Sequence, residues 1–328
     1  MEEKEKRGKE MRIPTYVISG FLGAGKTTVL LQLLSYCKEQ GLKPGIVLNE
    51  LGEINVEGHL FKGETLVELL DGCICCTIQD DLREELRFFL EPANAVDVLL
   101  IEGTGIANPK EIVETLDDPR LQNGFEVKSV ISLLDASNYL KQQRYLLNKH
   151  VRTLLEEQLT SATIVLLNKI DLIDQKVKDK IYKKLEKILH SSVPIIETSY
   201  GKCECAVLLQ ERVSHVVVHQ EGATTYHAAP RHAFQAFKIE GFHTVERIAF
   251  QRWLKSLPPA VLRGKGILTL AAPQGMYQFQ WASDELELQR IREDLPETSC
   301  VILIGYELPI EQIVASFHSE VLQRDYVK

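Results

Sequence analysis

A glycine-rich segment near the start of the chain restricts the fold more than any other feature. Residues 20–28 read Gly-Phe-Leu-Gly-Ala-Gly-Lys-Thr-Thr, and they lie between an apolar run at 13–19 and a helix-like pattern at 29–39. A strand, a glycine loop and a helix in this order are the setting of a phosphate-binding loop. We therefore expect an α/β domain in which such a loop joins the first strand to the first helix.

The residue types in this loop suit a nucleoside triphosphate. Glycines let successive backbone N–H groups curl around phosphate, Lys26 can reach the terminal phosphates, and the Thr27 hydroxyl can ligate Mg²⁺. The alternative is a glycine-rich turn with a chance lysine, which the flanking strand and helix patterns disfavour. The predicted nucleotide-binding residues of the loop are Gly20, Gly23, Ala24, Gly25, Lys26, Thr27 and Thr28.

Further apolar runs alternate with helical patterns over the first 200 residues. The predicted strands are 44–49, 96–101, 130–134, 163–167 and 193–196, and a helix is predicted at 177–189. This alternation favours a mostly parallel sheet that is covered by helices on both faces. Ligands of such sheets bind at the carboxyl ends of the strands, where the motifs of this chain fall.

An acidic residue follows the apolar run at 96–101, where the sequence reads Glu102-Gly-Thr-Gly105. The end of such a strand is where a phosphate-loop enzyme places its second residue on the magnesium side. We expect Glu102 to act through water, either on the ion or on the attacking water molecule. The alternative is an ordinary surface carboxylate. Lys26 and Glu102 are the predicted catalytic residues.

The segment Asn168-Lys-Ile-Asp171 directly follows the apolar run at 163–167. The Asp171 carboxylate can accept hydrogen bonds from both N1–H and N2–H of guanine, a pair of donors that adenine does not present. Lys169 can lay its aliphatic stem over the base. We therefore predict GTP rather than ATP, bound through Asn168, Lys169 and Asp171, with Thr198 and Ser199 as candidates to complete the base site.

Three cysteines occur within four residues, Cys73-Ile-Cys75-Cys76. Thiolates are soft ligands that favour zinc, copper(I) or cobalt over magnesium. In an extended strand Cys76 would face away from the other two thiols, so threefold ligation needs a bend, which Gly72 permits. A three-thiolate site with an open fourth position would suit transfer of the metal. The alternative is that these thiols are small buried apolar groups.

The composition changes after Lys202, and a second domain is predicted. We expect a phosphate-loop domain at 11–205, a linker at 206–231 and a smaller α+β domain at 232–328, with strands near 234–239, 266–270, 276–281 and 300–304 and a helix at 245–256. Solvated loop histidines are the simpler interpretation of a histidine cluster here, and an auxiliary metal site with Cys203 or Cys205 is the alternative. The clustered histidines are His215, His219, His227, His232 and His243.

Composition and charge exclude several other classes. A chain of 328 residues is longer than one domain usually needs, and its formal net charge of −8 argues against nonspecific nucleic-acid binding. No apolar run approaches the roughly 18 residues of a membrane span, and the charged start of the chain does not resemble a signal peptide. Seven cysteines, three of them crowded together, do not suit a disulfide framework. We expect a protein of the reducing cytoplasm.

These motifs together resemble the CobW-like metallochaperone GTPases, a family that includes the YjiA protein and nitrile hydratase activators. The resemblance rests on 20–28, Asn49-Glu-Leu-Gly-Glu53, Gly72-Cys-Ile-Cys-Cys76, Glu102-Gly-Thr-Gly105 and 168–171 in family order, and 261–266 resembles the start of a strand in the family's C-terminal domain. It implies a GTPase domain followed by a smaller domain, with metal and GTP binding coupled. It also implies that Glu50 and Glu53 lie near magnesium or the transition metal, although both can be plain acidic loop residues.

The resulting hypothesis is a GTP-hydrolysing metallochaperone. GTP with Mg²⁺ creates a transition-metal site at Cys73, Cys75 and Cys76, and hydrolysis releases the metal to a client metalloprotein. Zinc is the expected cargo, with cobalt or another transition metal as alternatives. Two other classes stay open, a regulatory or cofactor-assembly GTPase with structural cysteines and a non-catalytic metal buffer. A homodimer that forms with nucleotide or metal also stays open.

Overall fold

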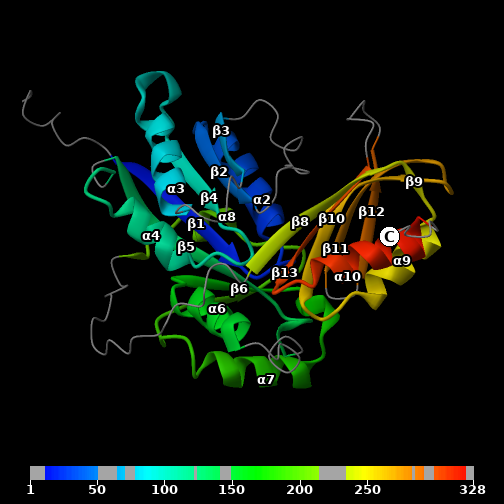
Figure 1. Cartoon of the computed structure of the whole chain (residues 1–328). Coiled ribbons are helices and arrows are strands. Elements are labelled where there is room, and N and C mark those ends of the chain that lie inside the picture. The colour runs from blue at the N-terminus through cyan, green and yellow to red at the C-terminus, as the bar shows by residue number, and fades with distance from the viewer. Residues whose placement is uncertain are drawn as a thin grey trace, which may run out of the picture. The chain divides into compact units, whose positions relative to one another are not determined.

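The structure is a computed structural model of the whole chain (Figure 1). It describes residues 12–50, 65–70, 78–121, 124–140, 149–213, 234–282, 285–291 and 299–322. The chain divides into two compact units, one built from most of residues 1–226 and the other mainly from residues 227–328. We call them the first and the second unit. Among the described residues, no helix has both the length and the apolar character that a membrane crossing needs.

The first unit alternates strands and helices, as the sequence predicts. Its strands are β1 (Ile13–Gly20), β2 (Pro44–Glu50), β3 (Thr65–Leu70), β4 (Val98–Glu102), β5 (Phe125–Asp135), β6 (Ile164–Asn168) and β7 (Ile195–Glu197). Its helices are α2 (Lys26–Glu39), α3 (Ile78–Arg87), α4 (Pro109–Leu116), α6 (Lys149–Thr160), α7 (Gln175–Leu185) and the short α8 (Cys205–Leu208). Turns of 3₁₀ helix occupy Phe88–Leu90, Pro92–Asn94 and Ile170–Leu172.

The seven strands form one sheet in the order β3-β2-β4-β1-β5-β6-β7. Neighbouring strands from β2 to β7 in this order pair in parallel. The central strand, β1, carries the glycine loop at its carboxyl end, between β4 and β5. The predicted parallel sheet of a phosphate-loop fold is therefore confirmed.

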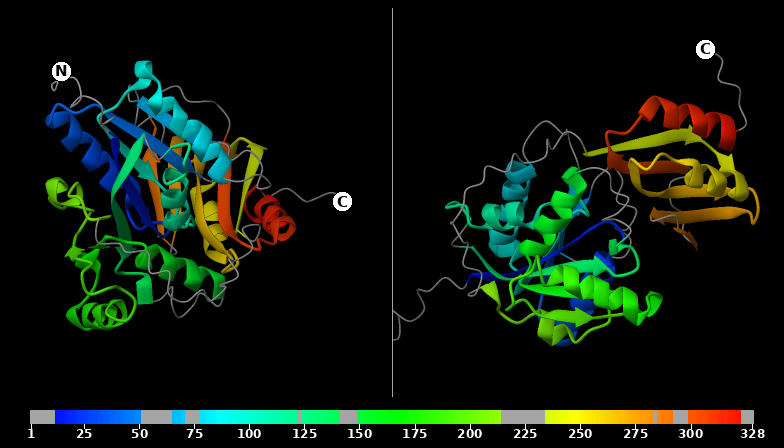
Figure 2. Two further views of the ribbon diagram at one scale, coloured as in Figure 1. Left: turned by 90° about the vertical axis from the view of Figure 1, so that its left-hand side faces the viewer. Right: turned by 90° about the horizontal axis from the view of Figure 1, so that it is seen from below.

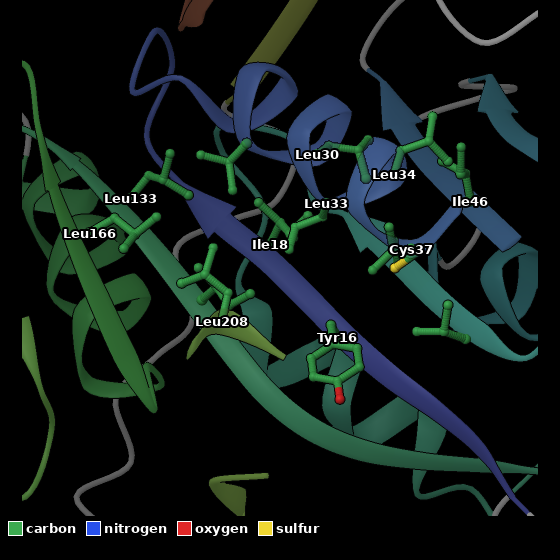
Figure 3. Close-up of a cluster of buried hydrophobic side chains, with 14 of the residues drawn as sticks. Tyr16, Ile18, Leu30, Leu33, Leu34, Cys37, Ile46, Leu133, Leu166 and Leu208 are labelled. Carbon is green, nitrogen blue, oxygen red and sulfur yellow. The ribbon is translucent and has the colours of Figure 1, made fainter. Parts of the chain in front are cut away.

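Helices cover both faces of the sheet. Alternate residues of each strand therefore point into separate cores on the two faces. On one face α2 packs across the strands, and Leu30, Leu33 and Leu34 contact Ile18 and its neighbours (Figure 3). On the other face α3 and α4 pack against a cluster that contains Val17, and α6 and α7 cover β5 and β6. Burial of these apolar faces is the main stabilising contribution to the unit.

Residues 205–213 belong to the first unit, although the sequence interpretation places those from 206 onward in the linker. Leu208 is fully buried in the core beneath α2. The Tyr16 hydroxyl donates to the Leu209 carbonyl at 2.6 Å, and the Arg212 N–H donates to the Lys128 carbonyl at 2.7 Å. These contacts hold the segment against β1 and β5.

The second unit is an antiparallel sheet with helices on one face, which confirms the predicted α+β character. Its elements are β8 (Phe234–Phe242), β9 (Thr244–Val245), α9 (Arg247–Ser256), β10 (Val261–Leu270), β11 (Gly275–Ala282), β12 (Glu285–Arg290), β13 (Ser299–Tyr306), α10 (Ile310–Ser316) and a π-helical turn at Phe317–Val321. The strand order is β12-β11-β10-β13-β8. The helices α9 and α10 lie on the same side of the sheet (Figure 2). Trp253 of α9 contacts Phe317, which directly follows α10, in one core over the sheet.

Among the element boundaries that differ from the prediction, two differ for identifiable reasons. The helix expected from residue 245 begins at Arg247, because Val245 pairs with Leu270 as part of β9. The helix expected to reach residue 189 ends at Leu185, after which hydrogen-bonded turns continue the chain. Neither difference changes the fold.

Candidate nucleotide site

The phosphate loop depends on glycine at positions where the backbone leaves no alternative. Gly20, Gly23 and Gly25 have backbone φ angles of 134°, 77° and 102°, which residues other than glycine rarely adopt. A Cβ atom on Gly20 would lie 2.3 Å from the Leu133 carbonyl oxygen, and one on Gly25 would lie 2.7 Å from the Asn168 amide nitrogen. The loop is therefore closely packed against β5 and β6.

Lys26 begins α2 and folds back over the loop. Its ammonium donates to the carbonyl of Gly20 at 2.9 Å and to that of Phe21 at 3.3 Å, and the residue is 5% exposed. Burial of an ammonium group is costly unless it is hydrogen-bonded, so these carbonyls fix the cation at the loop. The N-terminus of α2 adds a positive dipole end at the same place.

Thr27 and Glu102 meet at the carboxyl edge of the sheet. The Thr27 hydroxyl donates to the Glu102 carboxylate at 3.1 Å, because β4 pairs directly with β1 and brings Glu102 into register with Ile18. Hydroxyl and carboxylate oxygens are hard donors of the kind that Mg²⁺ prefers, so these two residues fit a magnesium ion. Glu50 ends β2 at the same edge, since Leu48 is in register with Glu102, but its side chain is outside the described part of the structure.

Asn168, at the end of β6, is hydrogen-bonded to the phosphate loop and to the segment after β7. It is 2% exposed, and its amide N–H donates to the Ala24 carbonyl at 2.9 Å. Its side-chain oxygen accepts hydrogen bonds from the Thr198 hydroxyl at 3.0 Å and the Gly201 N–H at 2.9 Å. The asparagine therefore joins the phosphate loop to the segment after β7, and Thr198 acts through Asn168.

Replacing Asn168 by alanine is expected to destabilise the first unit by about 3 kcal/mol, because it leaves three buried polar groups without their shared partner. The free energy of unfolding, measured in urea, would show the loss. Asn94→Ala is the matched control, because the Asn94 amide donates to the Glu91 carboxylate of its own surface turn. Equal stability of the two variants would mean that Asn168 does not hold the loops together.

The base motif continues with Lys169, whose φ angle is 60°. Its ammonium pairs with the Asp135 carboxylate at 2.9 Å. Asp135 ends β5, is 5% exposed, and also accepts hydrogen bonds from the Ser137 hydroxyl at 2.6 Å and the Asn138 amide at 3.0 Å. This network fixes the Lys169 stem. Sequence reasoning missed Asp135, although an acidic residue directly after the apolar run at 130–134 was a signal of the same kind as Glu102.

Asp171 is exposed, and the turn that carries it is tied to the segment after β7. The Ile170 N–H donates to the Thr198 carbonyl at 3.3 Å. The same segment contacts α2, because the Gln32 side chain donates to the Tyr200 carbonyl at 3.1 Å. The predicted base-reading and phosphate-binding residues thus lie in one connected group of loops.

The structure does not describe the predicted transition-metal ligands. Cys73, Cys75 and Cys76 lie outside the described residues, as do Glu53 and the histidines at 215, 219, 227 and 232. Within the described ranges, no group of three or more His, Cys, Asp and Glu side chains is arranged to hold a metal ion. His243 is exposed in the second unit.

Cys37 is part of the core beneath α2 (Figure 3). Cys203 and Cys205 pack against this core. Burial raises the pKa of the Cys37 and Cys203 thiols to about 11, with a smaller contribution from Cys205. Burial also raises the pKa of Cys205 itself. In the absence of a metal ion these three thiols are therefore protonated at neutral pH.

Comparison with known proteins agrees with this arrangement. Residues 14–197 match the family described as CobW/HypB/UreG, nucleotide-binding domain, and residues 234–321 match the cobalamin synthesis protein CobW C-terminal domain. The chain belongs to the CobW/HypB/UreG family. The resemblance in the sequence is thereby confirmed, and with it the expectation of a phosphate-loop GTPase.

Among the similar CobW-type proteins is the zinc chaperone CobW of Sinorhizobium sp, which is 29% identical over 79% of this chain and 82% of that protein. The zinc chaperone YjiA of Escherichia coli is 26% identical over 93% of this chain and 98% of that protein. The solved structure of Zn(II)-bound YjiA GTPase from E. coli aligns over 94% of this chain and 99% of that chain, with 24% identity and a TM-score of 0.47.

Proposed function

We propose that this protein is a GTP-hydrolysing metallochaperone that binds zinc through Cys73, Cys75 and Cys76 and passes it to a client metalloprotein. The observation that carries the proposal is the position of the thiols within the nucleotide-binding domain. They lie between β3, which ends at Leu70, and α3, which begins at Ile78, inside the segment that matches the family's nucleotide-binding domain. Relatives named as zinc chaperones support zinc as the cargo.

The proposal assigns a role to each of the connected loops at the carboxyl edge of the sheet. Lys26 and the N–H groups at the start of α2 bind the phosphates, and Asp171 selects guanine while the Asp135 pair holds Lys169 against the base. Thr27, with Glu102 acting through water, would hold Mg²⁺, which would supply charge neutralisation at the terminal phosphates. Glu102 also orients the attacking water molecule.

Cargo binding and nucleotide binding are coupled in the proposed cycle. GTP raises the zinc affinity of the thiolates, with Glu50 and Glu53 as candidate neighbours of the metals, and loss of the γ-phosphate lowers that affinity. By linkage, zinc must raise GTP affinity by the same factor. Cobalt or another transition metal is the alternative cargo, and a dimer of two chains in one nucleotide state is compatible with the cycle.

The thiol assignment is tested by the triple variant Cys73→Ser, Cys75→Ser, Cys76→Ser. We expect its zinc affinity to fall by about a hundredfold or more, since loss even of groups that only support a ligand costs about 10–100-fold. Competition with a chromophoric chelator gives the Kd. The double variant Cys203→Ser, Cys205→Ser is the control, because these thiols pack against the core.

The rival functions predict different outcomes. A regulatory GTPase with structural cysteines would show GTP turnover that responds neither to zinc nor to the triple Cys→Ser change, and this change would leave its zinc affinity unaltered. A metal buffer would lose zinc binding in the triple variant. Its Lys26→Ala variant would bind zinc as the wild type does, whichever nucleotide is present. Either pattern would replace the metallochaperone proposal.

A further inference from the structure

The segment that follows Glu102 lies between the phosphate loop and α6. We call residues 103–108 the linking loop. The Gly103 N–H donates to the Ile18 carbonyl at 3.0 Å. A Cβ atom on Gly105 would lie 2.7 Å from the Leu22 backbone nitrogen and 2.4 Å from its Cδ2 atom. The linking loop is therefore in direct contact with the phosphate loop, and Gly105 leaves no space for a side chain between them.

On its other side the linking loop is held by one side chain of α6. Gln158 is 2% exposed, and its amide nitrogen donates to the Gly105 carbonyl at 3.2 Å and to the Ala107 carbonyl at 3.1 Å. The side-chain amide of Gln158 thus donates both of its N–H groups to backbone carbonyls of the same loop. A buried amide with both hydrogen atoms committed fixes the position and the direction of this backbone.

The residue before Gln158 reinforces the contact. The Asn108 amide donates to the Glu157 carboxylate at 3.1 Å, and the Asn108 side-chain oxygen caps α4 by accepting from the Lys110 N–H at 3.0 Å. Within the linking loop, the Ala107 N–H donates to the Thr104 carbonyl at 3.0 Å. The loop is consequently held at one end by the Gly103 hydrogen bond to β1 and at the other by α6.

We propose that Gln158 is a positioning residue for GTP hydrolysis. By holding the Gly105 and Ala107 carbonyls, it sets the course of the backbone that begins at Glu102, and so the position of the Glu102 carboxylate relative to Thr27. Its side-chain hydrogen bonds go to the linking loop and not to the nucleotide-binding residues named above. Its loss should therefore slow the chemical step more than it weakens nucleotide binding. This inference rests on the GTP-hydrolysing function of the site.

Two variants of nearly unchanged size separate this role from simple packing. Gln158→Glu places a carboxylate against two carbonyl oxygens, and Gln158→Met removes both donors. We expect kcat to fall about tenfold or more in each, with KM for GTP changed less than about twofold. Glu156→Gln is the matched control on the same helix, because Glu156 is exposed and carries the reverse change of the same two side-chain types.

The Gln158→Glu variant has a second, pH-dependent readout. Burial raises the pKa of a carboxyl group, and in its protonated form the carboxyl group that this substitution introduces can donate to one of the two carbonyls. Its kcat relative to wild type should therefore recover as the pH falls from about 8 to about 6, whereas that of Gln158→Met should not.

A neighbouring carboxylate does not confuse this readout. Burial and the nearby Glu111 raise the pKa of Glu157, and Lys110 opposes this shift. Glu157 titrates in wild type and in Gln158→Met as well, so a recovery of relative kcat seen only in Gln158→Glu comes from the introduced carboxyl group and its coupling to Glu157.

A third readout does not depend on turnover. Amide hydrogen exchange of residues 103–108 should be faster in Gln158→Met than in wild type, while exchange in α2 stays unchanged. Unchanged exchange in this loop, or unchanged kcat in both variants, would overturn the assignment. A parallel loss of GTP affinity, Tm and kcat without recovery at low pH would overturn it as well, because Gln158 would then be only structural.

The same experiment distinguishes failure of this inference from failure of the proposed function. Faster loop exchange in Gln158→Met, found together with a wild-type protein that does not hydrolyse GTP, would count against the proposed function. The contact between Gln158 and the linking loop would then hold the loop without serving a hydrolytic reaction, and the positioning role would fall with it.

Discussion

Replacing Lys26 by alanine is expected to lower kcat for GTP hydrolysis by about 10²–10³-fold, the size of effect seen when one fixed charge-stabilising donor is removed from a catalytic site. The ammonium group is buried over the loop by the Gly20 and Phe21 carbonyls, so its charge is already in place before the γ-phosphate becomes more negative in the transition state. Phosphate release at saturating GTP is the measurement.

Lys38→Ala is the matched control, since Lys38 is exposed in the last turn of the same helix. Because Lys26 also ties the loop carbonyls together, binding of a fluorescent GDP analogue should be recorded for both variants. A Lys26→Ala protein that binds the analogue and still turns GTP over at the wild-type rate would contradict the assigned role of this lysine.

Replacing Asp171 by asparagine is expected to lower GTP affinity on the order of 10³-fold and to raise affinity for xanthosine triphosphate. The carboxylate accepts two hydrogen bonds from guanine, and hydrogen bonds to charged groups contribute about 1.5–3 kcal/mol each. Xanthine carries an oxygen where guanine carries the N2 amino group, so an asparagine N–H can donate to it. Competition titrations with the two triphosphates measure the exchange of specificity.

Asp179→Asn, an exposed position on α7, serves as the control for loss of a single negative charge. A variant at position 171 that loses affinity for both triphosphates by the same factor would indicate a damaged loop. Retained preference for GTP would mean that another residue reads the base.

The sequence predicted those parts of the fold and of the site that are marked by a short run of consecutive residues. The glycine loop, the run into Asn168 and each apolar run of the strand and helix alternation occupy a few consecutive residues, and the mostly parallel sheet that they predict is confirmed. The strands β3 and β12 were not predicted. The β12 segment reads Glu-Leu-Glu-Leu-Gln-Arg, and its glutamates have low strand propensity, so pairing with β11 overrides the local preference.

The supporting residues of the site could not be found in this way. Gln158 lies in the last turn of α6, and nothing in its neighbours indicates that its amide reaches a loop 51–53 residues away. The positive φ of Lys169 and its pairing with Asp135 likewise depend on how β5 and β6 lie side by side. Contacts between distant segments are a property of the fold and leave no local pattern.

The measurement that tests the central claim most directly is the zinc affinity of the purified full-length protein in two nucleotide states. Competition with a chromophoric chelator should be performed on protein saturated with GDP and on protein saturated with a non-hydrolysable GTP analogue. A GTP-gated chaperone predicts a Kd for zinc that is lower by about tenfold or more with the GTP analogue, which corresponds to about 1.4 kcal/mol of coupling. A zinc affinity and a cobalt affinity that each stay the same in the two states would contradict the coupling on which the proposed function depends.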